Sequence, residues 1–121
     1  MDKIQNSKRY DLEERTYQFA KEVAFFTKTL PNNIANHEYS SQVVRSSGSV
    51  GANYIEANEA LGKKDFLMRI KICRKEAKES AFWLRLIHET NNGQCKTDGL
   101  KLFNEAVELK KIFSAIHEKS K

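Results

Sequence analysis

The chain has 121 residues, of which 40% are hydrophobic and 31% charged, as in a folded globular domain and unlike a disordered segment. One proline and five glycines are too few for a many-stranded sandwich or barrel. The apolar runs are too short for a transmembrane helix, and no apolar stretch follows the charges of Met1–Asn6, so we expect no secretory signal, no membrane partner and a cytoplasmic location.

The net charge of +5 is unevenly distributed. Residues 63–95 carry eight basic and four acidic side chains, whereas residues 31–62 carry one basic and three acidic side chains. Because a concentrated positive charge attracts polyanions more strongly than a dispersed one, the third quarter of the chain is the region to inspect for a binding surface.

The first predicted element is a helix over residues 11–30. Its apolar positions alternate in steps of three and four, which places them on one helical face. These positions are Leu12, Thr16, Phe19, Val23, Phe26 and Leu30. Asp11 and Glu14 resemble a capping box at its start, and Pro31 with Asn32-Asn33 predicts its end.

The second predicted element is a helix over residues 36–61, although its serines and glycines favour a loop by propensity. One face carries Val43, Ser47, Val50, Tyr54, Ala57 and Leu61, and the neighbouring face carries Val44, Gly48, Gly51 and Ile55. We expect periodicity to override propensity here, because small side chains allow a neighbouring backbone to approach closely.

Two further helices are predicted over residues 64–91 and 98–119. The core face of the third carries Phe66, Ile70, Cys73, Ala77, Leu84 and His88, and that of the fourth carries Leu102, Ala106, Leu109, Phe113 and Ile116. Asn91-Asn92-Gly93 marks the end of the third helix, and Thr97 or Asp98 is the expected cap of the fourth. Short connections predict a single all-α domain, an antiparallel up-down four-helix bundle spanning residues 1–121.

No catalytic residue, metal site or cofactor is predicted. Gly48-x-x-Gly51 lacks the Lys-Ser/Thr pair of a phosphate loop. The His-Glu pairs beginning at His37, His88 and His117 fit neither HExxH nor Glu-x-x-His. Cys73 lies on the core face, where a thiol packs as a small hydrophobe, and Cys95 next to Lys96 has no placed histidine; both are expected to be reduced. We therefore expect no enzymatic activity.

The third helix carries a basic stripe, a set of side chains within an arc of about 100° roughly opposite its core face. Its members are Lys64, Lys71, Arg74, Lys75, Lys78 and Arg85, with Phe82 in the same arc. Cations beside an aromatic ring can bind phosphates and stack a base. The alternative is a solvated face that serves solubility, and the sequence gives the two interpretations about equal weight.

A second group of side chains on the same helix is apolar and lies outside the core face. Met68, Ile72, Trp83 and Leu86 point to neither the core nor the basic arc. An apolar patch that a monomer would leave exposed is typical of an interface. The sequence therefore predicts a homo-oligomer whose interface includes these four residues.

Three stretches resemble a known family: Gln42–Ser47, Ser49–Ala57 and Lys75–Leu86. They are similar to the four-helix-bundle proteins encoded by intervening sequences in bacterial large-subunit ribosomal RNA genes, although many members have Gly where this chain has Ala57. The resemblance implies a small cytoplasmic bacterial protein that assembles into a ring-like homopentamer. It also implies distant similarity to the accessory protein of diversity-generating retroelements, a basic barrel that binds nucleic acid and a reverse transcriptase. No enzymatic activity or catalytic residue is implied.

Two functions remain open from the sequence. One is an oligomeric accessory protein that binds the backbone of RNA or DNA through the basic stripe. The alternative is a protein–protein interaction module, in which another protein is the partner and the basic side chains serve solubility.

Overall fold

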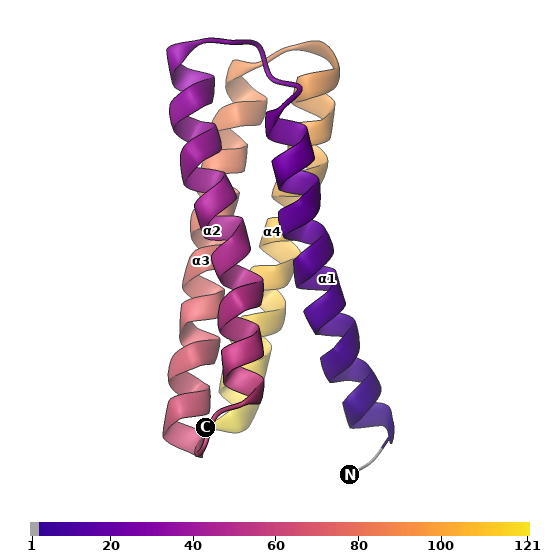
Figure 1. The fold of residues 1–121 in the computed structure, drawn as a ribbon, viewed down its shortest axis with the longest axis vertical. Coiled ribbons are helices and arrows are strands. Elements are labelled where there is room, and N and C mark those ends of the chain that lie inside the picture. The colour runs from indigo at the N-terminus through magenta and orange to yellow at the C-terminus, as the bar shows by residue number, and fades with distance from the viewer. Residues whose placement is uncertain (1–2) are drawn as a thin grey trace.

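The structure is a computed structural model that describes the backbone of residues 3–121 and the side chains of residues 11–121. Four α-helices account for almost all of it: α1 (Lys3–Thr27), α2 (Ile34–Asn58), α3 (Lys63–Thr90) and α4 (Gly93–Ser120). Consecutive helices run antiparallel and are joined by short connections (Figure 1). No strand occurs among residues 3–121, so the described chain has the all-α, four-helix architecture predicted from periodicity.

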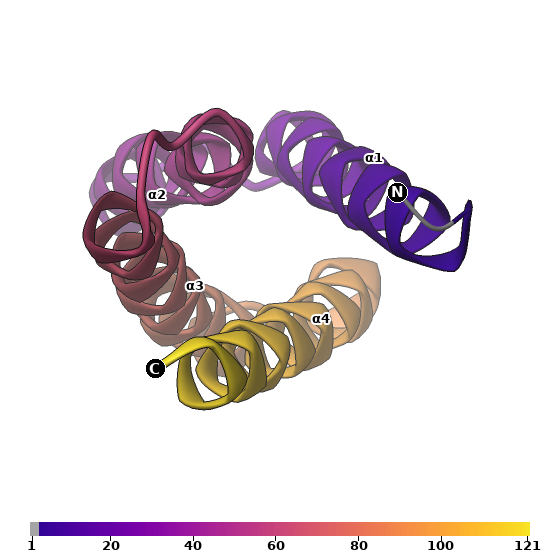
Figure 2. The same cartoon turned by 90° about the horizontal axis from the view of Figure 1, so that it is seen from below.

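The helices follow one another around the bundle axis, and α1 diverges from the rest toward its N-terminal end (Figures 1 and 2). At that end lies an apolar hollow of about 670 Å³, whose walls include Leu12, Tyr54, Phe66 and Ile116. One wall comes from each helix. The bundle is therefore less tightly closed here than in the central core.

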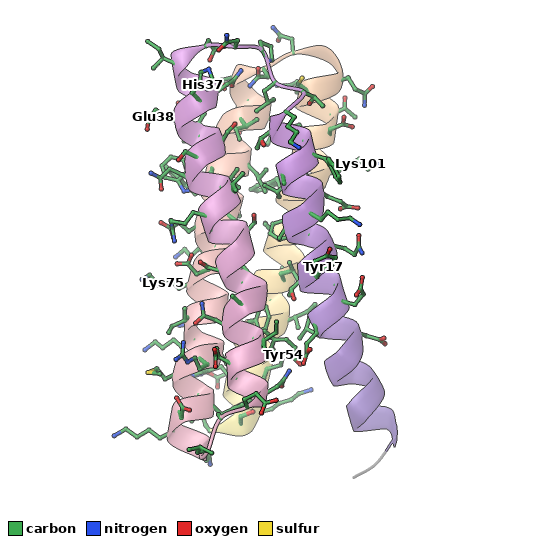
Figure 3. All side chains as sticks on the ribbon, viewed as in Figure 1. Tyr17, His37, Glu38, Tyr54, Lys75 and Lys101 are labelled. Carbon is green, nitrogen blue, oxygen red and sulfur yellow. The ribbon has the colours of Figure 1, made fainter. Side chains whose placement is uncertain are left out.

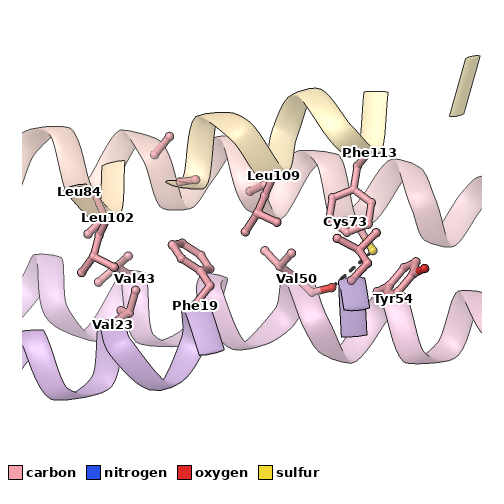
Figure 4. Close-up of a cluster of buried hydrophobic side chains, with 14 of the residues drawn as sticks. Phe19, Val23, Val43, Val50, Tyr54, Cys73, Leu84, Leu102, Leu109 and Phe113 are labelled. Atoms are coloured by element: carbon pink, nitrogen blue, oxygen red, sulfur yellow. Dashed lines mark hydrogen bonds between the residues drawn. The ribbon is translucent and has the colours of Figure 1, made fainter. Parts of the chain in front are cut away.

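Most of the core consists of the side chains that the helical periodicity selects (Figure 4), and Ala81 and Ile87 of α3 are buried in it without having been predicted. The predicted positions that are buried are Leu12, Thr16, Phe19, Val23, Phe26, Val43, Ser47, Val50, Tyr54, Ala57, Ile70, Cys73, Ala77, Leu84, Leu102, Ala106, Leu109 and Phe113. Near the helix ends, Leu30, Phe66, His88 and Ile116 are only half-buried. The apolar stripe of each helix thus faces the other helices, as burial of nonpolar surface requires.

Helix α2 confirms that periodicity outweighs local propensity. Ser46 and Ser47 are fully buried inside it, and their hydroxyls donate to the carbonyls of Val43 and Val44 at 3.4 and 3.3 Å. The Ser46 hydroxyl also lies 2.8 Å from that of Ser80 on α3. Because these hydroxyls have partners, their burial carries no penalty for an unsatisfied polar group, and their small size lets α2 and α3 pack closely.

The neighbouring face of α2 behaves as predicted at only one of its two glycines. A Cβ on Gly51 would lie 3.0 Å from Oγ1 of Thr16, so the missing side chain allows α1 to approach. Around Gly48, in contrast, a Cβ would meet nothing within 4 Å. Val44 and Ile55 are also exposed, so of this face only Gly51 lies against α1.

The predicted start of the first helix is wrong. Helix α1 begins at Lys3, so Asp11 is an exposed residue inside it rather than a cap. No proline or glycine stands between Lys3 and Asp11, and nothing in the sequence interrupts the helix there. At the other end α1 stops at Thr27, and a 3.0 Å bond from the Thr29 N–H to the Phe26 carbonyl tightens the following turn.

Two other predicted boundaries are also corrected. Helix α2 begins at Ile34, capped by Asn33, whose side chain accepts from the Asn36 N–H at 2.8 Å, and it ends at Asn58. Leu61 therefore follows the helix and is fully exposed instead of joining the core.

Helix α4 begins at Gly93, five residues before the predicted start, so Thr97 and Asp98 lie within it and do not cap it. Gly93 has φ +61°, a left-handed backbone conformation that glycine adopts without a steric penalty. The Asn91-Asn92-Gly93 signal thus ends one helix and begins the next with almost no loop between them.

Candidate functional site

Four cations of the predicted stripe surround one hollow on α3. Lys71, Arg74, Lys75 and Lys78 follow one another at helical spacings of three, one and three, which keeps them on one side of the helix. The hollow has a volume of about 580 Å³ and extends to the boundary with α4. Its lining comprises Met68, Lys71, Ile72, Arg74, Lys75, Lys78, Lys110 and Ser114. We call this surface the basic hollow.

The side of the bundle that carries the basic hollow is remote from α1. Lys75 projects from α3 on one side of the bundle, whereas Tyr17 of α1 and Lys101 of α4 lie on the other (Figure 3). The lysines of α1 and the first half of α4 therefore belong to a separate surface.

The five cations of the basic hollow form no ion pair with a carboxylate among residues 11–121. The ion pairs found there involve Arg15, Arg45, Arg85 and Lys121. Arg74 is the one of the five that acts on a carboxylate at longer range: the pKa of Glu118 is lowered, first by its hydrogen bond to Lys121 and to a smaller extent by Arg74. The hollow therefore keeps most of its positive potential.

The acidic residues of α3 that could neutralise this charge are held elsewhere. Glu76 and Glu79 pair with Arg45 of α2 at 3.2 and 3.0 Å. The hydrogen bond to Glu79 is the main cause of the raised pKa of Arg45. Arg45 thus holds both carboxylates on the side of α3 that faces α2.

Three residues of the predicted stripe lie outside the basic hollow. Lys64 is exposed at the start of α3 and does not line it. Arg85 pairs with Glu89 at 3.0 Å, and this hydrogen bond lowers the pKa of Glu89. The Phe82 ring is 56% exposed and meets the ring of Trp83 edge-on, with a centroid distance of 5.0 Å. Phe82 therefore belongs to an aromatic cluster as much as to the cationic surface.

Lys110 is the cation of the hollow that the sequence does not predict. It follows the buried Leu109 on α4 and is itself half-buried. The pattern of α4 predicts which residues face the core but not which flank lies against α3. No signal in the sequence connects Lys110 with lysines more than thirty positions earlier.

The four predicted interface residues divide into two groups. Met68 and Ile72 line the basic hollow together with the cations, and their place in an oligomer interface stays a prediction. Trp83 is half-buried beside Tyr39 of α2, with ring centroids 6.0 Å apart, and Leu86 is also half-buried. The two groups lie on nearly the same face of α3, because eleven residues make close to three helical turns, but Trp83 lies further along the helix, where it meets Tyr39 of α2.

The cysteines show no sign of an activated thiol. Burial raises the pKa of Cys73 to about 12, and its Sγ lies 3.4 Å from the carbonyl oxygen of Val50. The Sγ of Cys95 lies 3.6 Å from the Thr29 carbonyl. Among the described residues, no three His, Cys, Asp or Glu side chains are grouped to hold a metal ion, and no helix is long and apolar enough to cross a membrane.

Comparison with known proteins agrees with the fold. Among solved structures, the chain is similar to a protein of unknown function from the S23 ribosomal protein family of Bacteroides thetaiotaomicron, whose crystal structure was determined at 1.70 Å. The TM-score is 0.74 and the sequence identity 26%, over 87% of this chain and 96% of that one. No curated protein sequence matches the chain. The family model for the 23S rRNA-intervening sequence protein matches residues 8–115. The chain therefore belongs to the 23S rRNA-intervening sequence protein family.

Proposed function

We propose that this protein is a non-enzymatic accessory protein of the bacterial cytoplasm that binds RNA or DNA through the basic hollow and acts as a homo-oligomer. The observation that carries the proposal is the cluster of five cations, Lys71, Arg74, Lys75, Lys78 and Lys110, around one hollow without an ion-paired carboxylate in the described part of the chain. Such a surface gains free energy by releasing counterions from a phosphate backbone.

The chemistry of the hollow favours affinity without sequence selection. Lysine and arginine side chains that contact phosphates fix the position of a nucleic acid but do not distinguish its bases. None of the described residues that line the hollow is Asn or Gln, the side chains whose amides hydrogen-bond to the edge of a base. We therefore expect weak sequence preference and strong salt dependence.

Charge reversal of Lys71, Lys75 and Lys78 to Glu is expected to weaken RNA and DNA binding on the order of 100-fold or more at about 100 mM salt, since three phosphate contacts become repulsive. Fluorescence anisotropy across a salt series measures the effect. All three side chains are exposed, so circular dichroism and oligomer mass are expected to remain those of the parent.

The matched control reverses Lys21, Lys28 and Lys101, three lysines on α1 and α4 that are exposed and lie outside the hollow. It changes the net charge by the same amount and is expected to reduce binding far less. Equal binding by the parent and the first triple variant would contradict the proposal and would favour a protein–protein interaction module instead.

The homo-oligomer is proposed from the apolar surface and the family resemblance, which favours a ring-like pentamer. Phe82 on α3 and Val44 and Ile55 on α2 are large apolar side chains with about half of their surface exposed. Trp83 and Leu86 lie half-buried on α3. Because a monomer would leave this surface in water, association is the expected outcome.

Light scattering is expected to give a mass of about 70 kDa, that of five protomers of 14.0 kDa. Phe82→Asp is expected to lower this mass, because a carboxylate beside Trp83 would be costly to bury between protomers. Phe25→Asp serves as the control, since Phe25 is similarly exposed but lies on α1. A monomer of the parent at micromolar concentration would contradict the oligomer.

A further inference from the structure

We propose that the basic hollow selects single-stranded over double-stranded nucleic acid, an inference that rests on the proposed function. Three features of the hollow support it: two of its cations are recessed, apolar side chains stand among the cations, and its cationic row is short. Each favours a flexible strand with accessible bases over a rigid duplex.

The recessed cations are Arg74 and Lys110, which are half-buried between α3 and α4, whereas Lys71, Lys75 and Lys78 are exposed. The phosphates of a duplex lie on a stiff convex surface, so only the projecting cations would reach them. A single strand can bend until a phosphate enters the hollow. Two or three of its phosphates could then share all five cations, whereas the phosphates of a duplex would meet only the three exposed ones.

The apolar side chains are Met68 and Ile72, which line the same hollow as the cations. In a duplex the base faces are stacked and hidden, and these two side chains would meet only charged phosphates and sugars. An unstacked base of a single strand presents an apolar face that can pack against them. Stacking and packing of this kind tolerate any base sequence.

The cationic row spans eight residues of α3, from Lys71 to Lys78, a rise of about 10 Å. This length suits about two or three phosphates of one strand. If each phosphate neutralised on a single strand contributes about −0.7 to the log–log salt slope, one hollow is expected to give a slope of about −2.

The experiment compares a labelled oligouridine of about 12 nucleotides, a size within the range of known single-strand sites, with an RNA duplex of the same length. Binding to the intact oligomer is measured by anisotropy from about 50 to 500 mM salt. The parent is expected to bind the single strand at least about tenfold more tightly than the duplex at equal salt, because two more cations take part.

The informative variant is Lys110→Gln, with Lys111→Gln as its control on the next residue of α4, which is exposed and outside the hollow. Lys110→Gln is expected to weaken single-strand binding about three- to tenfold while changing duplex binding less than about twofold. Lys111→Gln is expected to leave both nearly unchanged. Lys110→Arg, which keeps the charge, is expected to retain single-strand binding.

The outcomes separate this inference from the function on which it rests. Equal affinity for the two probes, or equal effects of Lys110→Gln and Lys111→Gln, would overturn strand selection while leaving nucleic-acid binding intact. Binding of neither probe at low salt would overturn the proposed function itself. Inorganic triphosphate is expected to compete only at large excess; displacement of the oligouridine at equimolar triphosphate would show a simple anion site and would also overturn strand selection.

Discussion

Phe113→Ala is expected to lower the free energy of unfolding by about 3–5 kcal/mol. The Phe113 side chain is fully buried, and its ring meets the ring of Tyr54 edge-on at a centroid distance of 5.6 Å. It packs above Cys73 in the middle of the core (Figure 4). Truncation to alanine removes the buried ring and leaves a cavity in the core. The helices around the cavity are closely packed and would have to shift to fill it.

Chemical denaturation at a fixed protomer concentration measures this effect, since association would otherwise contribute to the apparent stability. Phe25→Ala is the control: it deletes the same ring from a position that is 59% exposed, and its effect is expected to stay within about 0.5 kcal/mol. A loss under about 1 kcal/mol for Phe113→Ala would place Phe113 outside the core and would contradict its ring contact with Tyr54 across the bundle.

Asn91→Ala is expected to lower the free energy of unfolding by about 2–3 kcal/mol, because it leaves a buried amide without its partner. Asn36 and Asn91 exchange reciprocal hydrogen bonds of 3.1 and 2.9 Å between their side chains. Each also donates to a carbonyl, that of Pro31 and that of Ile87, both at 2.9 Å. The pair joins the α1–α2 connection to the α3–α4 connection at one end of the bundle.

A double-mutant cycle with Asn36→Ala measures the coupling between the two amides. The double variant is expected to lose less stability than the sum of the single variants, because removing both amides leaves fewer unpaired groups. Asn104→Ala, at an exposed position of α4, is the control and is expected to be nearly neutral. Strict additivity of Asn36→Ala and Asn91→Ala would show that the amides stabilise the protein independently.

The helices could be predicted from the sequence because their stabilising interaction is periodic. Helix α2 is the clearest example: its serines and glycines oppose a helix locally, yet Val43, Val50 and Tyr54 recur at the spacing that buries one face. Helix ends were less predictable. They depend on single hydrogen bonds, such as that from the Asn36 N–H to the Asn33 side chain, which stabilise a boundary by only about 1 kcal/mol.

The candidate site was predictable only within one helix. Lys71, Arg74, Lys75 and Lys78 could be grouped because helical spacing alone places them side by side. Arg85 has the same spacing but pairs with Glu89, four residues later. An acidic residue four positions later was the available signal for that pairing, but Lys75 has the same signal in Glu79, which pairs instead with Arg45 of α2.

The sequence by itself determined that this protein is a bundle of four helices, most of the residues that form its core, and that positive charge gathers on α3. Each follows from the order of residues along one helix. Only the tertiary structure decided which flank of α3 lies against α4. That contact adds Lys110 to the basic hollow and places Met68 and Ile72 among the cations. It also brings Asn36 to Asn91. These contacts join residues that are far apart in the chain. They depend on the rotation of each helix about its axis and on how the helices pack against one another. The periodicity of a single helix specifies neither.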